Sequence, residues 1–229
     1  MNRIVVLTGA GMSAESGLST FRDNNGLWNN YRVEEVATPE AWENNMDLVL
    51  DFYNQRRKQL YEAEPNAAHK ALARLEERYE VDIITQNVDD LHERGGSTRV
   101  LHLHGELKKV RSTGDPDLIY DLEGWELKKG DLCEKGCQLR PHIVWFGEPV
   151  PLITDAADIA NKADIFLVIG TSLQVYPAAG LLHYVPIESP KILIDPKARP
   201  VSFIENLKIY NEKAAEAVPG LVEALLEEM

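Results

Sequence analysis

Near its start, the chain runs from a short apolar strand directly into a glycine-rich loop, and this junction constrains the fold more than any other segment. Ile4–Leu7 is a β-branched run typical of a buried parallel strand. Gly9 and Gly11 follow, and glycines let the backbone turn tightly and approach a ligand. Ser13–Ser16 can start a helix, whose N–H groups favour a pyrophosphate. The junction therefore predicts a nucleotide site at a strand–loop–helix turn.

The glycine spacing departs from the dinucleotide fingerprint of dehydrogenases. Gly17 stands six residues after Gly11, whereas the fingerprint places its next glycine three residues on. Such a site favours chemistry other than hydride transfer. A glycine-rich turn without any ligand is the alternative, and the loop alone does not decide between the two.

Composition excludes several classes of protein. The chain has 229 residues, 44% hydrophobic and 27% charged, as in a globular domain. Its 24 basic and 37 acidic residues give a net charge of −13, which argues against a nucleic-acid surface. No apolar run is long enough to span a membrane, and the first residues do not form a signal peptide. Two cysteines do not suggest a disulfide scaffold, so we expect a cytoplasmic location.

Short apolar runs alternate with helical stretches along the chain. The predicted strands are Ile4–Leu7, Val81–Thr85, Ile165–Ile169 and Lys191–Ile194. The predicted helices are Asn66–Arg78, Asp155–Lys162 and an amphipathic one at Pro219–Met229. This alternation predicts an α/β fold, a mostly parallel sheet flanked by helices.

Polar segments follow three of the predicted strands. The glycine loop follows the first, Gln86–Asp89 follows the second, and Gly170–Ser172 follows the third. Because ligands bind at the carboxyl ends of parallel strands, we expect these segments to converge on one crevice. Gln86, Asn87 and Asp89 could bind a carboxamide and ribose hydroxyls there, although a surface turn is the alternative.

Two regions interrupt the alternation of strands and helices. Trp28–Glu64 is mainly helical in pattern, and Lys108–Arg140 is rich in loop residues. We interpret them as an inserted smaller module. The predicted core comprises residues 1–30, 76–106 and 142–229, and the module comprises residues 31–75 and 107–141, within one catalytic domain.

Two histidines occur in the segment Leu101–Leu107. We expect this segment to be a strand, on which His102 and His104 point to opposite faces, so that only one faces a given crevice. An imidazole titrates near neutral pH and suits a general base, but a structural histidine is the alternative. Arg140–Glu148 then supplies either an edge strand or a docking edge for an extended peptide.

Taken together, the motifs resemble those of the sirtuin family. They are the glycine loop ending in Phe21-Arg22-Asp23, Gln86-Asn87-Val88-Asp89, His104-Gly105, Phe146-Gly147-Glu148 and Gly170-Thr171-Ser172. They occur in the sirtuin order and span most of the chain. The resemblance implies NAD-dependent removal of acyl groups from protein lysines, on a Rossmann-like domain with a small inserted module.

The resemblance also implies which residues contact NAD. They are Gly9, Ala10, Gly11, Met12, Ser13, Glu15, Phe21, Arg22, Trp28, Gln86, Asn87, Val88, Asp89, His104, Gly170, Thr171, Ser172, Asp195 and Ala214. Among these, Asn87 and Asp89 would hold the nicotinamide carboxamide, and Gln86 the ribose hydroxyls. Thr171 and Ser172 would bind the adenosine side.

The implied catalytic residues are His104, Asn87 and Arg22. In the implied mechanism, the acyl-lysine carbonyl oxygen attacks the nicotinamide ribose and expels nicotinamide. His104 then helps to activate a ribose hydroxyl, which takes over the acyl group. The products are free lysine, nicotinamide and an O-acyl-ADP-ribose.

A pair of side chains bears on the identity of the acyl group. Tyr53 and Arg56 lie three residues apart and share one side of a predicted helix, but Arg57 fits the spacing as well. The resemblance chooses Arg56, because Tyr53-x-x-Arg56 with Ala37 resembles the sirtuin branch that removes succinyl and malonyl groups. Ala37 would leave room, Arg56 would pair with the acyl carboxylate, and Tyr53 would donate a hydrogen bond to it. A solvated basic patch is the alternative.

The resemblance assigns four more residues to the substrate and puts a metal site in doubt. Val144, Phe146, Gly147 and Glu148 would contact the peptide. Sirtuins usually hold a structural zinc with four cysteines, but only Cys133 and Cys137 exist here. We therefore expect no zinc, and a module held by packing of Leu118, Tyr120, Leu122 and Trp125.

Two other functions remain as alternatives to deacylation. An NAD-dependent oxidoreductase would produce NADH, which an absorbance assay detects. A non-catalytic NAD or ADP-ribose sensor would not need a base such as His104. For the favoured function, we expect acyl-lysine proteins as substrates, no nucleic-acid or membrane partner, and a monomer.

Overall fold

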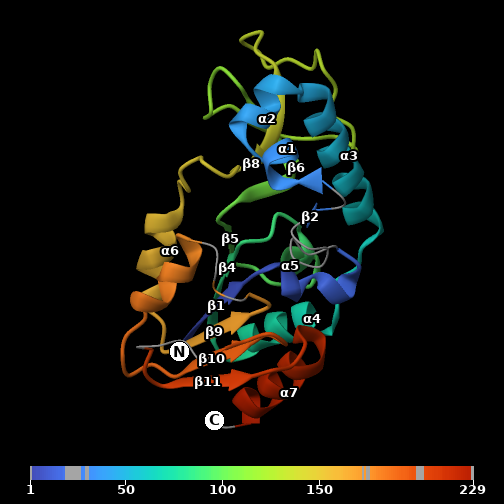
Figure 1. Ribbon diagram of the computed structural model, residues 1–229. Helices are drawn as coiled ribbons and strands as arrows, with labels where there is room; N and C mark the ends of the chain where they lie inside the picture. The colour runs from blue at the N-terminus through green and yellow to red at the C-terminus, as the bar shows by residue number, and fades with distance from the viewer. Residues whose placement is uncertain are drawn as a thin grey trace. The chain divides into compact units, whose positions relative to one another are not determined.

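The computed structural model describes residues 2–18, 31–171, 173, 176–199 and 204–227, together with the backbone of residues 27–28. They belong to two compact units (Figure 1). Unit 1 comprises residues 1–18, 64–103 and 150–229, and unit 2 comprises residues 19–63 and 104–149. These bounds differ from the predicted ones, since residues 64–75 lie in unit 1 and residues 19–30, 104–106 and 142–149 lie in unit 2.

Unit 1 is built on a six-stranded sheet with the order β11-β10-β9-β1-β4-β5. Every neighbouring pair is parallel. The strands are β1 (Arg3–Thr8), β4 (Glu80–Thr85), β5 (Val100–His102), β9 (Ile165–Ile169), β10 (Lys191–Ile194) and β11 (Leu207–Tyr210). The predicted parallel sheet is confirmed. Strand β11 was not predicted, and β5 covers only the start of the segment Leu101–Leu107, which was expected to be one strand.

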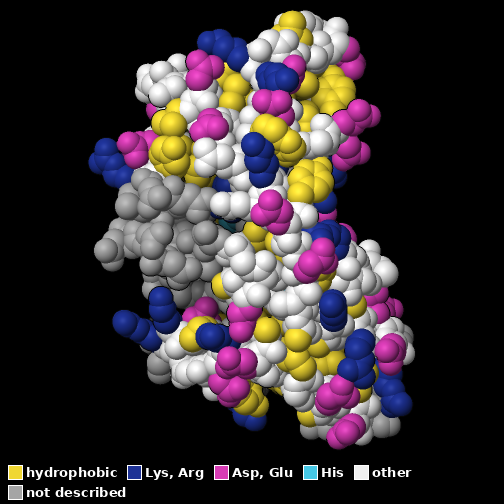
Figure 2. Space-filling view, turned by 90° about the vertical axis from the view of Figure 1, so that its right-hand side faces the viewer, with side chains coloured by type: hydrophobic (Ala, Val, Ile, Leu, Met, Phe, Trp, Pro, Cys, Tyr) yellow, Lys and Arg dark blue, Asp and Glu magenta, His cyan; other side chains and the backbone are white. Residues whose placement is uncertain are grey.

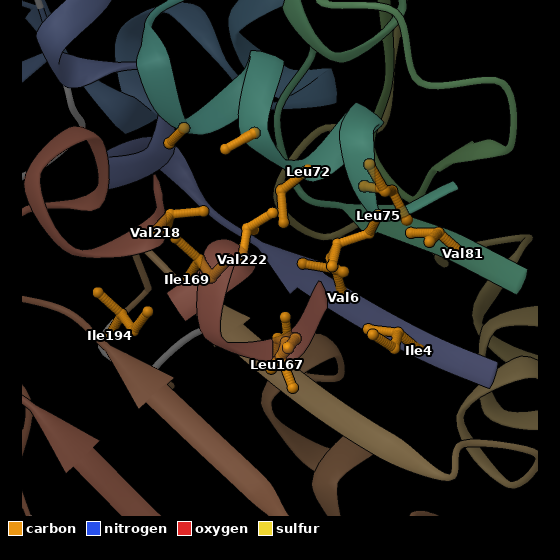
Figure 3. Packing of buried hydrophobic residues seen from close by; sticks show 14 of the residues in the cluster. Ile4, Val6, Leu72, Leu75, Val81, Leu167, Ile169, Ile194, Val218 and Val222 are labelled. Carbon is orange, nitrogen blue, oxygen red and sulfur yellow. The ribbon is translucent and has the colours of Figure 1, made fainter. Parts of the chain in front are cut away.

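Helices cover both faces of this sheet because successive residues of each strand point to opposite sides. Ile4 and Val6 of β1 pack in a cluster with Leu72 and Val222, whereas Val5 and Leu7 pack in a second cluster on the other face. Figure 3 shows Val6 and Leu72 among the labelled side chains of the first cluster. All four β1 residues have no exposed surface, as a strand buried on both faces requires.

The helices of unit 1 divide between the two faces. On one face lie α4 (Ala67–Arg74), the 3₁₀ turn η3 (Leu75–Glu77) and α7 (Ala214–Glu227). On the other lie α6 (Ile153–Ala160) and η4 (Ala178–His183), as Figure 1 also shows for α6. The remaining helical elements are η1 (Ala10–Met12), η2 (Ala14–Ser16) and α5 (Leu91–Arg94).

Unit 2 combines three helices with small antiparallel sheets. The helices are α1 (Val33–Val36), α2 (Pro39–Asn44) and α3 (Met46–Glu62). The strands are β2 (Leu27–Trp28), β3 (Tyr31–Arg32), β6 (Gly105–Ser112), β7 (Ile119–Asp121) and β8 (Leu139–Ile143). Strands β2 and β3 pair with each other, and β7-β6-β8 form a second sheet in which β8 is an edge. The predicted helical character of residues 28–64 is confirmed from α1 onward.

The surface carries both signs of charge. On the face shown in Figure 2, Asp and Glu side chains are interspersed with Lys and Arg over the part that the structure describes. Among the described helices, none combines the length and apolarity needed to cross a membrane.

Candidate functional site

Polar side chains that follow β1, β4 and β9 meet at the carboxyl edge of the unit 1 sheet. Asn87 Nδ2 donates to Gly9 O at 3.1 Å, which joins the end of β4 to the glycine loop. Gln86 Nε2 donates to Thr171 Oγ1 at 3.3 Å, which joins the end of β4 to the end of β9. The predicted convergence of the three segments is therefore confirmed. Parallel strands bring their carboxyl ends to one edge regardless of their separation in sequence.

The glycines of the loop allow it to pack against the end of β9. Gly11 N donates to Gly170 O at 2.8 Å. A Cβ on Gly11 would lie 2.8 Å from Gly170 Cα, and one on Gly170 would lie 2.2 Å from Met12 N. Gly170 also has a φ of +65°, which L side chains rarely adopt. Close contact between two backbone segments therefore requires glycine at these positions, and the predicted approach to a ligand stays a prediction.

The loop after β1 is described as far as Leu18, and there the helix predicted to start at Ser13–Ser16 is a short 3₁₀ turn and not an α-helix. It forms the 3₁₀ turns η1 and η2, and Gly17 with a φ of +88° ends the second. Glu15 Oε2 accepts a hydrogen bond of 2.8 Å from Ala215 N in the first turn of α7. A carboxylate at this helix end satisfies an N–H group that has no partner within the helix. Glu15 was predicted to contact NAD, and the structure gives it this anchoring contact.

The segment after β4 places an amide and a carboxyl in the protein interior. Asn87 and Asp89 are 7% and 6% exposed, and Asn87 Nδ2 also donates to Ser13 Oγ at 3.1 Å. Asp89 Oδ1 accepts from Leu91 N at 3.2 Å. Burial raises the pKa of Asp89 above its ordinary value, even though hydrogen bonds from Leu91 and Ser13 act in the opposite direction. An amide and a carboxyl so placed can donate to and accept from a carboxamide.

Two buried histidines, which the sequence analysis did not single out, support this segment. Asn66 N donates to His69 Nδ1 at 3.3 Å, so the proton of the neutral ring is on Nε2, which lies 3.5 Å from Ser13 Oγ. Burial lowers the pKa of His69 to about 4. His92 Nε2 lies 2.9 Å from Thr8 Oγ1, and burial lowers its pKa as well. Both rings are therefore neutral near pH 7.

The two histidines of the segment 101–107 do not share a strand, so that prediction is wrong. Strand β5 ends at His102, His104 lies in a turn, and β6 begins at Gly105. Gly105 has a φ of +84°, and a Cβ there would lie 2.0 Å from His142 O. This backbone conformation and this close approach require a glycine, which the alternation of apolar and polar residues could not reveal.

His102 holds the backbone of the Asn87 segment within unit 1. Its Nδ1 lies 3.2 Å from Asn87 O, and its Nε2 lies 2.8 Å from Glu93 Oε1. A carbonyl oxygen only accepts hydrogen bonds, so Nδ1 is the nitrogen of His102 that donates to Asn87 O. His102 is thus suited to orienting Asn87, while His104 remains the predicted base.

The predicted adenosine-side residues lie at the ends of β9, β10 and the start of α7. Thr171 and Asp195 are each 9% exposed, and Ala214 is 3% exposed. Asp195 Oδ1 accepts from Lys197 N at 2.8 Å, which stabilises the turn after β10. Of the other predicted contacts, Met12 is buried, Val88 is half-buried and Ala10 is exposed. Phe21, Arg22, Ser172 and the side chain of Trp28 lie outside the described residues.

In unit 2, α3 buries Tyr53 and Arg56 together. Tyr53 is 0% exposed and Arg56 is 8% exposed, and the Arg56 guanidinium carbon lies 5.8 Å from the centre of the Phe52 ring. Burial raises the pKa of Tyr53 to about 12, although a hydrogen bond from Trp145 and the charge of Arg56 act to lower it. The phenol therefore keeps its proton throughout the physiological range.

Arg57, the other candidate of the sequence analysis, serves the architecture of unit 2. Its Nε donates to Leu107 O at 2.6 Å, and its Nη1 donates to Asn54 Oδ1 at 2.7 Å. Asn54 in turn donates through Nδ2 to Leu127 O at 3.0 Å and accepts from Leu127 N at 2.9 Å. Burial lowers the pKa of Arg57 to about 10. These contacts hold the segments around residues 107 and 127 to α3.

The segment predicted to contact the peptide, residues 144–148, forms backbone hydrogen bonds to two other predicted site residues of unit 2. Phe146 N donates to Ala37 O at 3.0 Å, and Val144 N donates to His104 O at 2.9 Å. Ala37 is 2% exposed, whereas Phe146 is 45% exposed, and Gly147 has a φ of +90°. Backbone pairing thus brings the segments at residues 37, 104 and 144–146 together.

Glu148 is engaged within the protein. Its carboxylate accepts from Arg140 at 2.7 and 3.0 Å, from Arg111 at 3.2 Å, and from Trp145 N at 2.8 Å. Burial alone would raise the pKa of Glu148, but hydrogen bonds from Arg140 and from Trp145 N outweigh it and hold the pKa below its ordinary value. The ionised carboxylate orients its neighbours, and its contact with the peptide stays a prediction.

The loop-rich part of unit 2 offers few metal ligands. Cys133 and Cys137 are free thiols, and Cys133 Sγ lies 3.3 Å from Ser112 Oγ. Among the described residues, no cluster of three or more His, Cys, Asp or Glu side chains could hold a metal ion. Two thiols do not complete the four-ligand set of a structural zinc. Leu118, Tyr120, Leu122 and Trp125, which were predicted to form the packing core, are all only half-buried.

Comparison with known proteins gives a consistent result. Residues 9–177 match the model of the Sir2 family. A Helicobacter pylori protein named NAD-dependent protein deacylase is 54% identical over 227 residues, which cover 99% of each chain. A Bacteroides thetaiotaomicron protein of the same name is 54% identical over 231 residues, again covering 99% of each chain.

Solved structures agree with these relatives. A crystal structure of a Sir2 homologue in complex with NAD has a TM-score of 0.89 at 41% identity, covering 99% of this chain and 90% of that chain. A Sir2 variant solved with a p53 peptide and NAD has a TM-score of 0.78 at 30% identity, covering 98% and 92%. Because the family model spans residues 9–177 and the relatives align along nearly the whole length, this chain belongs to the Sir2 family.

Proposed function

We propose that this chain, an NAD-dependent protein deacylase of the Sir2 family, removes succinyl and malonyl groups from protein lysines in preference to acetyl groups. The observation that carries the proposal is the buried pair of Tyr53 and Arg56 on α3. Succinyl and malonyl groups end in a carboxylate, and acetyl does not. A buried cation beside a phenol that keeps its proton therefore favours the acidic class.

The chemistry of the two side chains supports this preference. Three arginine charges act to lower the pKa of Tyr53, and that of Arg56 has a larger effect than those of Arg140 and Arg57. This is expected if Arg56 is the guanidinium that acts together with the Tyr53 phenol. A guanidinium presents a planar set of donors that matches both oxygens of a carboxylate. Arg57 cannot take the same role without releasing Leu107 O and Asn54. Ala37 contributes only a methyl group at its buried position.

The residues at the edge of the unit 1 sheet fit NAD. Asn87 and Asp89 would hold the nicotinamide carboxamide, with Ser13 fixing both side chains, and Gln86 would contact ribose hydroxyls. The adenosine side would fall to Thr171 and to the other residues at the ends of β9 and β10, Gly170 and Asp195. When bound, NAD supplies a sugar that accepts the acyl group once nicotinamide has left.

The proposed roles of the chain's own residues follow from their donors and acceptors. Asn87 and Asp89 orient the leaving group through amide and carboxyl contacts. His104 accepts the proton of a ribose hydroxyl on an imidazole nitrogen, as a general base does. Arg22, which lies outside the described residues, would assist near the reacting sugar.

Activity of the Arg56→Met variant tests the acyl preference. Peptides of one sequence carrying acetyl-, malonyl- or succinyl-lysine are incubated with NAD, and the O-acyl-ADP-ribose products are followed by mass spectrometry. We expect Arg56→Met to reduce turnover of the succinyl and malonyl peptides at least tenfold more than turnover of the acetyl peptide, since a charge-assisted contact contributes about 1.5–3 kcal/mol. Arg56→Lys, which keeps the charge and loses the planar donor set, should fall between. Equal losses for all three peptides would refute the assignment.

We also propose that unit 2 folds without zinc. The contacts of Asn54 and Arg57 with residues 107 and 127 support this, because they tie the loop-rich segments to α3 through buried hydrogen bonds. Metal analysis of the purified protein should find no stoichiometric zinc, and a chelator should leave the melting temperature unchanged. One zinc per chain would contradict the proposal.

Finally, we propose that the protein is a monomer in the cytoplasm. The free thiols of Cys133 and Cys137 are compatible with a reducing compartment. Size-exclusion chromatography with light scattering measures the mass, which should be that of one chain of 25.7 kDa. A mass of twice this value would refute the monomer.

A further inference from the structure

We propose that Trp145 is a positioning residue that directs the hydroxyl proton of Tyr53 toward the acyl carboxylate and thereby strengthens the preference for acidic acyl groups. This inference rests on the proposed function of Tyr53 and Arg56, and it assigns a role to a residue that the sequence analysis passed over. It is carried by one buried hydrogen bond and by the contacts that fix its donor.

The hydrogen bond joins an obligate donor to the phenol oxygen. Trp145 Nε1 donates to Tyr53 Oη at 3.0 Å, and the two side chains are 2% and 0% exposed. An indole N–H can only donate, so the phenol oxygen must accept. The single hydroxyl proton of Tyr53 is then directed away from the indole and can reach another acceptor. Without Trp145, the hydroxyl could rotate freely about its C–O bond.

The phenol retains this proton under working conditions. Burial raises the pKa of Tyr53 to about 12, more than the opposing effects of Trp145, Arg56 and Arg140 lower it. A neutral phenol donates to a carboxylate, whereas a phenolate would repel it. Tyr53 and the Arg56 guanidinium therefore present a proton donor and a cation to the same anion.

A guanidinium and a second indole contact the ring of Trp145, and a hydrogen bond holds its backbone. The Arg140 guanidinium carbon lies 3.3 Å from the ring centre, a cation–π contact. The Trp42 ring lies 5.7 Å away between centroids, tilted by 39°. Glu148 connects these restraints, because its carboxylate accepts from both Arg140 and Trp145 N. One carboxylate thus fixes the backbone of Trp145 and the cation on its ring.

This arrangement predicts an effect that depends on the acyl group. A succinyl carboxylate uses the directed proton of Tyr53, whereas an acetyl group has no carboxylate to receive it. Losing the indole N–H should therefore raise KM for the succinyl and malonyl peptides much more than for the acetyl peptide. A purely structural role of Trp145 would instead reduce activity on all three peptides alike.

The test uses the full chain with Trp145→Phe, which keeps an aromatic ring for Arg140 and removes the N–H. We expect KM for the succinyl peptide to rise roughly tenfold, equivalent to about 1.4 kcal/mol, with an effect on the acetyl peptide several times smaller. A second variant carries a benzothienyl analogue of tryptophan at position 145, in which sulfur replaces N–H in the same two-ring shape. It should reproduce the effect even if Trp145→Phe is too unstable to measure.

A double-mutant cycle shows whether Trp145 acts through Tyr53. In the Tyr53→Phe background, Trp145→Phe should no longer change KM for the succinyl peptide, because the hydroxyl is already absent. Equal losses on all peptides, or a loss that persists in the Tyr53→Phe background, would overturn the inference. A wild-type enzyme that does not prefer the succinyl peptide would instead refute the proposed function, so the two failures are distinguishable.

Discussion

Replacing Asn54 with alanine tests whether buried hydrogen bonds from α3 hold the loop-rich part of unit 2. The Asn54 side chain, 9% exposed, makes three hydrogen bonds: with Leu127 O at 3.0 Å, with Leu127 N at 2.9 Å and with Arg57 Nη1 at 2.7 Å. The first two are bonds between neutral groups and contribute about 1 kcal/mol each, whereas the bond with the charged guanidinium contributes about 1.5–3 kcal/mol. Asn54→Ala should therefore lower the free energy of unfolding by about 4 kcal/mol.

This loss is measured by urea unfolding followed by tryptophan fluorescence, and by thermal melting. For a chain of this size, about 4 kcal/mol corresponds to a melting temperature lower by roughly 8–16 °C. Gln55→Ala is the matched control one position along the helix, because Gln55 is exposed and, among the described residues, its side chain donates to the exposed Asp51. It should cost less than about 0.5 kcal/mol. A loss below about 1 kcal/mol for Asn54→Ala would refute the reasoning.

Two further predictions concern pH. The pKa of His69 is about 4 in the folded state and 6.5 in the unfolded state. The neutral ring of His69 therefore contributes its full stability above pH 6.5, and this stability is lost as the pH falls toward 4. His69→Gln should flatten the melting temperature over this range, and an unchanged acid slope would contradict it. The pKa of Asp89 is shifted in the opposite direction, because burial raises it above the unfolded value of 3.8. The protonated carboxyl of Asp89 therefore stabilises the fold below pH 3.8, and this stability is lost as the pH rises through the folded pKa. Asp89→Asn should therefore melt at a higher temperature than wild type at pH 7, by a margin that shrinks near pH 4, while losing deacylase activity. A lower melting temperature at pH 7 would show that burial does not dominate at this carboxyl.

The edge of the unit 1 sheet could be predicted from sequence because it depends on local patterns. Ile4–Leu7 is a continuous apolar run and Val81–Thr85 is a mostly apolar one, and each is followed by polar residues at its carboxyl end. The topology of parallel strands then brings Asn87 to Gly9 without any knowledge of the contact itself. The sequence therefore predicted that these segments lie together, but it did not reveal that the glycines of the loop also pack against the end of β9.

Contacts between distant residues could not be predicted in the same way. Asn54 and Leu127 are 73 residues apart, and Tyr53 and Trp145 are 92 residues apart, so neither pair leaves a pattern in the sequence. The turn between β5 and β6 also escaped prediction, because Gly105 at its end packs against a residue distant in sequence, His142. For Arg56 and Arg57, spacings of three and four residues from Tyr53 both fit one side of a helix, so spacing alone left the choice open. The resemblance favoured Arg56, and the structural partners of Arg57 agree with that choice.

Competition between acyl groups tests the central claim most directly. The wild-type enzyme is given NAD and an equimolar mixture of two peptides of one sequence, one carrying succinyl-lysine and the other acetyl-lysine, and the initial rates of both products are read by mass spectrometry. The buried Tyr53–Arg56 pair predicts at least tenfold faster conversion of the succinyl peptide. Equal conversion, or faster conversion of the acetyl peptide, would contradict the account.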